Sequence, residues 1–242
     1  MKPFYVHLEI NSNLYLKDPQ KTKLGRKIIE KSVLLIDEIG LEQFTFKKLA
    51  KIIPSTEASI YRYFENKHTL FVYLLNWYWE WMIVRIKFNT MNIRQADEKL
   101  NIALRIIVDT ASRNTEVEFV NEDVLHRIVV REGAKGYHHK LVDEDNSDGF
   151  FLAYKRLCSL IASIILEIRP DFTYPKAFAS TLVETANNNI YFARHLPRLT
   201  DIKGENDDDQ QLGEKVTRML EYLAFGLLYG QDHQSERHRV AI

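Results

Sequence analysis

Four helix-start signals in the first third of the sequence constrain this chain more than any other feature. Each is a residue suited to capping a helix N-terminus, followed by apolar residues at helical spacing. The capping residues are Asp18 (followed by Pro19), Thr45, Thr56 and Asn66. Gly40 and Pro54 fit helix ends, because glycine tolerates positive φ and proline cannot continue a helix. The predicted helices cover about 19–39, 46–53, 57–63 and 67–88.

The rest of the chain also shows helical periodicity. Further helices are predicted at about 95–112, 118–132, 148–168, 175–195 and 212–229. The segment 200–211 is polar and is expected to be a solvated loop. No segment has the pattern of a central strand, so we expect an all-α protein of about nine helices. Residues 1–70 would form an N-terminal arm and a three-helix domain, and 71–242 a larger helical domain.

The first 17 residues allow two interpretations. Phe4, Val6, Leu8 and Ile10 alternate with polar residues, as in a short strand, but a flexible arm is equally compatible with the sequence, and we favour the arm.

Charge is distributed unevenly although the 242-residue chain has a formal net charge of zero. Residues 1–70 contain 12 basic and 8 acidic side chains, and the remainder is acidic by the same margin. A basic front end favours a nucleic-acid partner. The start of the chain lacks a signal-peptide pattern, and no apolar run is long enough to span a membrane. The single cysteine, Cys158, is expected to be a buried, inert thiol, and a cytoplasmic location follows.

Two short capped helices joined by a tight turn form a helix-turn-helix, whose second helix can enter the major groove of DNA. Hydroxyl and basic side chains suited to phosphate and base contacts accompany it. The candidate DNA-binding residues are Thr45, Lys47, Lys48, Thr56, Glu57, Ser59, Tyr61, Arg62 and Lys67.

The sequence LAK at 49–51 and SIYRYFENKHTL at 59–70 resembles the DNA-binding signature of TetR/AcrR-family transcriptional regulators. Every spacing matches without a gap, and the resemblance covers about 22–72. It implies a homodimeric regulator, which we expect to be a repressor. Each third helix would enter one major-groove half-site of a palindromic operator. Tyr61 and Lys67 would hold phosphates, Thr45 would present the second helix to the backbone, and Tyr63 and Phe64 would be core.

The resemblance also implies a small-molecule effector in the second domain and a dimer formed through the last two helices. Their apolar faces offer Phe178, Leu182, Tyr191, Val216, Met219, Leu220, Leu223, Leu227 and Leu228, which a monomer would need for its own core.

Three residues depart from the family pattern. Pro54 stands where the family usually has glycine with positive φ, and proline both excludes that conformation and pushes Ile53 away from helical geometry. Glu57 favours the helix dipole but would repel phosphates, and Ala58 replaces a frequent glycine. The alternative function is therefore a helical interaction protein that kept the fold and lost specific DNA binding.

The candidate effector site includes aromatic and polar residues of the second domain. The Trp77-Tyr78-Trp79-Glu80-Trp81 run cannot all face one core, so it either packs between elements or lines a pocket. The residues proposed for a pocket are Trp77, Trp81, Arg105, His126 and Tyr154.

Neither a metal site nor a catalytic site is expected. His138 and His139 are adjacent, whereas a helical metal-binding pair needs i,i+3 or i,i+4 spacing. The Asp207–Asp209 triplet lacks the other ligands of a calcium loop. Nucleophile-elbow, phosphate-loop and dinucleotide motifs are also missing from the sequence, so we expect no enzyme and no cofactor.

Overall fold

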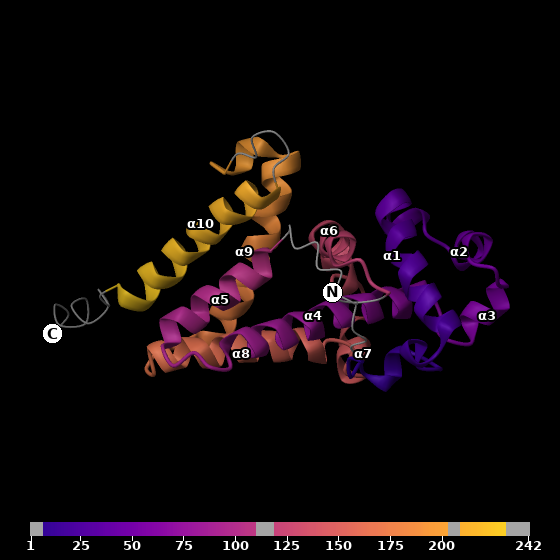
Figure 1. The fold of residues 1–242 in the computed structure, drawn as a ribbon, viewed down its shortest axis with the longest axis horizontal. Coiled ribbons are helices and arrows are strands. Elements are labelled where there is room, and N and C mark those ends of the chain that lie inside the picture. The colour runs from indigo at the N-terminus through magenta and orange to yellow at the C-terminus, as the bar shows by residue number, and fades with distance from the viewer. Residues whose placement is uncertain (1–6, 110–118, 203–208, 231–242) are drawn as a thin grey trace.

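The computed structural model describes residues 7–109, 119–202 and 209–230 (Figure 1). These residues form ten α-helices and four short 3-10 helices, and none of them forms a strand. The all-α prediction is confirmed. Within the described ranges, no helix combines the length and apolarity that crossing a membrane requires.

The helices are named in chain order. They are α1 (Lys23–Gln43), α2 (Phe46–Ile52), α3 (Glu57–Tyr61), α4 (Lys67–Thr90), α5 (Ala96–Val108), α6 (Glu122–Glu132), α7 (Val142–Ser147), α8 (Leu152–Ile168), α9 (Pro175–His195) and α10 (Asp209–Tyr229). The 3-10 helices are η1 (Ser12–Leu14), η2 (Pro19–Lys21), η3 (Gly133–Gly136) and η4 (Pro197–Leu199).

Two of these elements differ from the prediction. Helix α7 was not expected, because its residues carry no apolar stripe and none of them is buried. Asp18 caps the 3-10 turn η2 instead of a long helix, and α1 begins only at Lys23, with the Thr22 side chain accepting a hydrogen bond from Gly25 N. The predicted loop 200–211 falls largely outside the described residues, as does most of the Asp207–Asp209 triplet, and α10 already begins at Asp209.

The prediction of a flexible arm is wrong for residues 7–16. Leu8, Ile10 and Leu14 are buried in the core. The Gln20 side chain accepts from Leu8 N at 3.1 Å and donates to Leu8 O at 2.8 Å. Hydrogen bonds to both backbone groups of Leu8 fix this segment without a neighbouring strand. Phe4 and Val6 of the alternating pattern lie outside the described residues.

Helix α4 runs from the α1–α3 end of the molecule into the other helices, which lie around it (Figure 1). It packs against α5, α6 and α8, while α1 packs against α6. The expected boundary between residues 70 and 71 therefore falls in the first turn of a continuous helix. The division into two domains stays a prediction.

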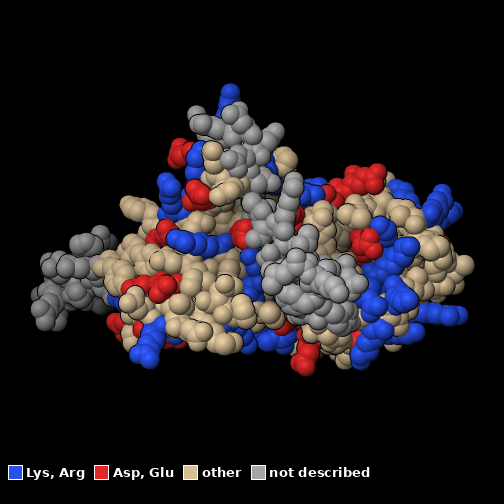
Figure 2. All heavy atoms as spheres, viewed as in Figure 1, with Lys and Arg blue, Asp and Glu red and all other residues tan. Residues whose placement is uncertain are grey.

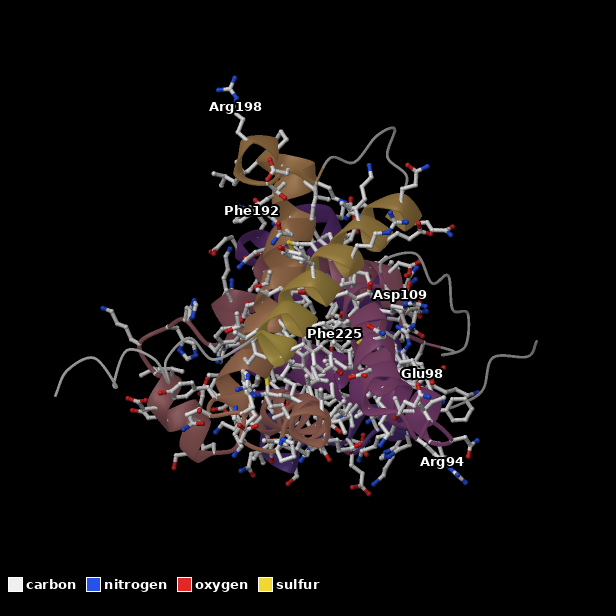
Figure 3. All side chains as sticks on the ribbon, turned by 90° about the vertical axis from the view of Figure 1, so that its left-hand side faces the viewer. Arg94, Glu98, Asp109, Phe192, Arg198 and Phe225 are labelled. Atoms are coloured by element: carbon white, nitrogen blue, oxygen red, sulfur yellow. The ribbon has the colours of Figure 1, made fainter. Side chains whose placement is uncertain are left out.

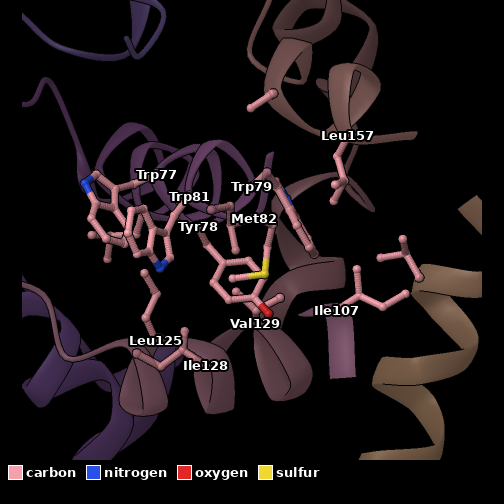
Figure 4. Packing of buried hydrophobic residues seen from close by; sticks show 14 of the residues in the cluster. Trp77, Tyr78, Trp79, Trp81, Met82, Ile107, Leu125, Ile128, Val129 and Leu157 are labelled. Atoms are coloured by element: carbon pink, nitrogen blue, oxygen red, sulfur yellow. The ribbon is translucent and has the colours of Figure 1, made fainter. Parts of the chain in front are cut away.

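The aromatic run of α4 is core (Figure 4). Trp77 is fully buried and stacks on Trp81 with ring centroids 6.2 Å apart. The Trp81 indole N–H donates to Glu122 Oε2 of α6 at 2.6 Å. Tyr78 and His126 of α6 form a buried polar pair, with Tyr78 Oη 2.6 Å from His126 Nδ1. Burial lowers the pKa of His126 to about 4 and raises the pKa of Tyr78.

Gly40 was expected to adopt a positive φ at the end of the first helix. Its φ of 76° confirms the predicted positive φ, but its ψ of 157° is extended, a combination accessible almost only to glycine. We predict that Gly40→Ala lowers the free energy of unfolding by about 1–3 kcal/mol in chemical denaturation. Gly133 has helical angles, φ −53° and ψ −41°, so Gly133→Ala is the control and should not destabilise the protein. Equal losses in both variants would contradict the assignment of strain to Gly40.

The buried Tyr78–His126 pair predicts a pH dependence of stability. The pKa of His126 in the folded protein lies below its unfolded value of about 6.5, so the folded state binds a proton at this side chain less readily than the unfolded state does. Its contribution is complete above pH 6.5 and is lost as the pH falls toward 4, with about 2 kcal/mol gone at pH 5. His126→Gln cannot gain this proton, so the free energy of unfolding should fall less steeply between pH 7 and pH 5 in the variant. Parallel pH profiles for the two proteins would refute the assignment.

Candidate nucleic-acid interface

Helices α2 and α3 form the helix-turn-helix expected from the sequence. The Thr45 side chain accepts from Lys48 N at 3.2 Å, and the Thr56 side chain accepts from Ser59 N at 3.3 Å. Asn66 caps α4 in a reciprocal capping box with Thr69. The three predicted caps are confirmed.

The turn between α2 and α3 accommodates Pro54 by a different geometry. Helix α2 ends at Ile52, and Ile53 is extended, with φ −92° and ψ 143°, as expected for a residue before proline. Ser55 N donates to Ile53 O at 2.7 Å across Pro54. This three-residue hydrogen bond is that of an inverse γ-turn, whose central φ of about −75° suits proline. The turn therefore needs no residue with positive φ.

Helix α2 packs against α1 and α3, and apolar residues of α2 and α3 belong to the hydrophobic core. Leu49 and Ile60 are fully buried, and Phe46 packs edge-on against Tyr61 with ring centroids 5.0 Å apart. Tyr63 and Phe64 are buried, in agreement with their expected core role. The Tyr63 hydroxyl also forms a 2.8 Å hydrogen bond with the Thr22 hydroxyl at the start of α1.

The nine candidate DNA-binding residues lie at one end of the molecule. The exposed ones are Thr45, Lys47, Lys48, Thr56, Tyr61, Arg62 and Lys67, and the partly exposed ones are Glu57 and Ser59. Figure 2 shows Lys and Arg side chains gathered at the end that α1–α3 form in Figure 1. We name these nine residues the reading surface.

Two lysines of the reading surface contact main-chain carbonyls near the end of α1. Lys48 Nζ donates to Gln43 O at 2.8 Å, and Lys67 Nζ lies 3.4 Å from the carbonyl oxygens of both Leu41 and Glu42. Lys67 thus connects the start of α4 with the end of α1, just before α2 begins.

Two further lysines were not singled out from the sequence. Lys51 is exposed in the last turn of α2, and Lys17 lies with its Nζ 5.4 Å from the centre of the Tyr63 ring. Lys51 lies in the LAK signature, which could have indicated it. Lys17 lies in the segment interpreted as a flexible arm, so no local pattern could place it.

The residues predicted to line an effector pocket do not come together. Trp77, Trp81 and His126 belong to the core described above. Arg105 is exposed on α5, with its guanidinium 3.9 Å from Glu221 of α10. Arg105 lines a hollow of about 510 Å³ between α5 and α10, whereas Tyr154 lines a separate hollow between α4 and α8.

The hollow beside Tyr154 is small, about 190 Å³, and mostly apolar. It is lined by Val72, Leu75, Asn76, Trp79, Tyr137, Phe150, Phe151, Tyr154 and Lys155. The hydroxyls of Tyr137 and Tyr154 both donate to Glu184 Oε1 of α9 at 2.7 Å. Burial raises the pKa of each tyrosine, and contact with the Glu184 carboxylate raises it further. Nearby, burial raises the pKa of the Cys158 thiol to about 11, which suits the inert role expected for it.

Comparison with known proteins finds a partial sequence match and a wider match in fold. No protein-family profile matches the chain. Over 81 residues, 34% of its length, the chain is 32% identical to the nucleoid occlusion factor SlmA of Haemophilus influenzae strain PittGG. That match spans only 37% of SlmA, so the chain covers little more than a third of the curated relative.

Solved structures match over a larger part of the chain. A putative TetR-family transcriptional regulator from Syntrophomonas wolfei superposes with a TM-score of 0.62 and 16% identity, over 87% of this chain and all of that one. AibR, solved with isovaleryl coenzyme A and operator DNA, superposes with a TM-score of 0.55 and 16% identity, over 80% of this chain and 97% of AibR. With its helix-turn-helix and its following helices arranged alike, the chain has the fold of the TetR-family transcriptional regulators.

Proposed function

We propose that this protein is a ligand-responsive transcriptional repressor that binds a palindromic DNA operator as a homodimer in the cytoplasm. The observation that carries the proposal is the reading surface, in which a capped helix-turn-helix exposes hydroxyl and basic side chains at one end of the molecule. The description of AibR as a complex with operator DNA supports it. The protein from Syntrophomonas wolfei is described as a transcriptional regulator, which favours a regulatory role over a catalytic one.

DNA recognition would be divided between α3 and the elements beside it. Thr56 and Ser59 lie in the first turn of α3, from which side chains reach base edges in the major groove. Tyr61, Lys47 and Lys67 would bind phosphates, which position the helix without reading sequence. Two such helices in a dimer would contact half-sites about 34–36 Å apart.

Glu57 would restrict which bases are accepted. It lies in the first turn of α3, where a carboxylate cannot bind phosphate but can accept a hydrogen bond from the cytosine N4 amino group. We therefore propose that Glu57 contributes specificity at the expense of non-specific affinity.

The proposed dimer face lies on α9 and α10 (Figure 3). Five of the apolar residues considered for it are buried within the protomer: Phe178, Leu182, Val216, Leu220 and Leu228. Tyr222, Leu223, Leu227 and Tyr229 of α10 are exposed instead. Leu223 and Leu227 lie one helical turn apart, and exposed apolar residues of this kind favour a symmetric helical contact with a second copy.

The proposed effector site is the hollow beside Tyr154. Asn76 and Trp79 of α4 line it, and the same helix begins at Lys67 of the reading surface. A ligand that binds more tightly to one position of α4 would shift the distance between the two reading surfaces. The size and lining of the hollow favour a small apolar molecule with one hydrogen-bonding group.

DNA binding is tested with the full chain and a pool of genomic fragments at low salt, followed by titration of the selected fragment. We expect a sequence preference. Replacing Lys47, Lys48 and Lys67 by alanine should weaken binding, and the slope of log K against log salt should become shallower by about 0.9 for each phosphate that is no longer neutralised.

Arg94 and Arg198 provide the matched control. Arg94 follows the far end of α4, Arg198 lies in η4, and both project from the part of the molecule opposite the reading surface (Figure 3). Their alanine variants should bind as the unmodified protein does. If no fragment is preferred, or if the lysine variants bind unchanged, the helical interaction protein becomes the better explanation.

The dimer is tested by sedimentation of the 28.5 kDa chain. We expect twice this mass for the unmodified protein, and a monomer for a Leu223→Lys, Leu227→Lys double variant, because like charges would be buried at the contact. Phe88→Lys changes an exposed apolar residue on α4 and should leave the dimer intact. A double variant that remains dimeric would exclude this face.

A further inference from the structure

Two imidazoles and one carboxylate meet where α7 packs against the first turn of α4. His68 is the second residue of α4, His139 precedes α7, and Asp145 lies within α7. Figure 1 shows α7 beside the N-terminal end of α4. His68 is far from the other two residues in the sequence, and the proposed contacts with DNA and effector use none of the three.

Their donor atoms converge. His68 Nε2 lies 2.6 Å and His139 Nε2 lies 3.2 Å from the same atom, Asp145 Oδ2. The two imidazole rings are 4.7 Å apart between centroids. One ligand atom from each residue lies within 4.8 Å of the other two. Two segments of the chain, the start of α4 and the stretch from His139 into α7, therefore direct potential ligands to one point.

The cluster is sheltered but accessible, and its polar atoms are incompletely paired. The exposed fractions of the side chains are 35% for His68, 23% for His139 and 14% for Asp145. His139 Nε2 is itself buried and has no hydrogen-bond partner among the described residues, because its contact with Asp145 is not aligned as a hydrogen bond. A buried ring nitrogen without a hydrogen-bond partner indicates that the cluster can bind an additional ion or molecule.

We propose that His68, His139 and Asp145 form a binding site for a divalent transition-metal ion of the Zn²⁺ class. Two imidazoles and a carboxylate suit zinc and its neighbours, and three protein ligands leave a fourth position for water. Mg²⁺ and Ca²⁺ prefer sites made only of oxygen ligands, so this donor set discriminates against them.

Small side-chain movements would bring the three ligand atoms to the distances that a zinc ion requires. Zinc–ligand distances near 2.1 Å in a tetrahedron place ligand atoms about 3.4 Å apart. The 3.2 Å distance from His139 to Asp145 already fits, while the 2.6 Å distance from His68 to Asp145 must lengthen. Binding through Nε2 also moves the ring proton of His139 to Nδ1 and gives up the 3.3 Å hydrogen bond that this atom accepts from Leu141 N.

The local charge favours a cation. Asp143, Glu144 and Asp145 occupy the first turn of α7, and Asp148 follows its last residue. Two lysines offset part of this negative charge: Lys140 precedes α7 in the sequence, and Lys155 Nζ donates to Asn146 Oδ1 of α7. An ion held at the cluster would restrain α7 against the start of α4, and would add to the contacts that Asn11 and Asn13 make with the Asp148 carbonyl.

The site is tested by titrating the chelator-treated full chain with Zn²⁺ by calorimetry and with Co²⁺ by visible absorption. We expect one saturable site per chain that involves this cluster, a Co²⁺ spectrum typical of mixed nitrogen and oxygen ligands, and a higher melting temperature with Zn²⁺ but not with Mg²⁺ or Ca²⁺. His68→Gln, His139→Gln and Asp145→Asn should each weaken Zn²⁺ binding at least about tenfold, since even residues behind the ligands alter affinity by 10- to 100-fold.

His138→Gln is the matched control, because His138 is the exposed neighbour of His139 and lies outside the cluster. It should bind Zn²⁺ as the unmodified chain does. His139→Gln is the decisive variant, since without metal it loses only the contacts of one partly exposed side chain with His68, Leu141 and Asp145. Its metal-free melting temperature verifies that it folds. The proposal is overturned if the unmodified chain binds neither Zn²⁺ nor Co²⁺, or if folded His139→Gln binds Zn²⁺ with unchanged affinity.

Discussion

The burial of residues 69–83 of α4 on nearly all sides of the helix is the constraint on which the rest of the structure depends. Most surface helices carry one apolar stripe, but the aromatic run of α4 presents large side chains in every direction. Trp77 and Trp81 face α6, Trp79 packs on Tyr154 of α8, and Tyr73 contacts Phe64 and Tyr15. A helix of this kind is stable only when other elements enclose it, so the N-terminal segment and the later helices must close around it.

The same constraint connects the two proposed binding regions. A tightly packed helix moves as a unit, because its side chains cannot repack one at a time without leaving cavities. Lys67 and His68 begin this helix, and Asn76 and Trp79 line the hollow between α4 and α8. Asn76 also donates to the carbonyls of both Val72 and Phe150, which fixes α4 to the start of α8. A ligand in the proposed hollow would therefore alter the position of the reading surface through α4 itself.

Features encoded within a few residues could be predicted from the sequence, and features created by distant contacts could not. Thr45, Thr56 and Asn66 bond to backbone groups three residues ahead, so their roles are visible in a short window. Helix α7 is held by neighbours and has no stripe of its own. The five suggested effector residues were chosen because they are aromatic or polar, but they lie in different parts of the fold. His139 was considered only with its neighbour His138, whereas its contacts come from His68 and Asp145.

Pro54 and Glu57 are both departures from the family pattern, but the structure separates them. The turn accepts proline because the hydrogen bond from Ser55 N to Ile53 O closes around a negative φ, and Leu49 and Ile60 remain fully buried on either side. Glu57 has no such structural accommodation: it lies in the first turn of α3, and under the proposed function its carboxylate would face the base edges of the DNA. The charged residue, rather than the proline, is therefore the one that we propose to influence DNA recognition. Its charge would alter which bases can be accepted, whereas a distorted turn would have displaced α3 itself.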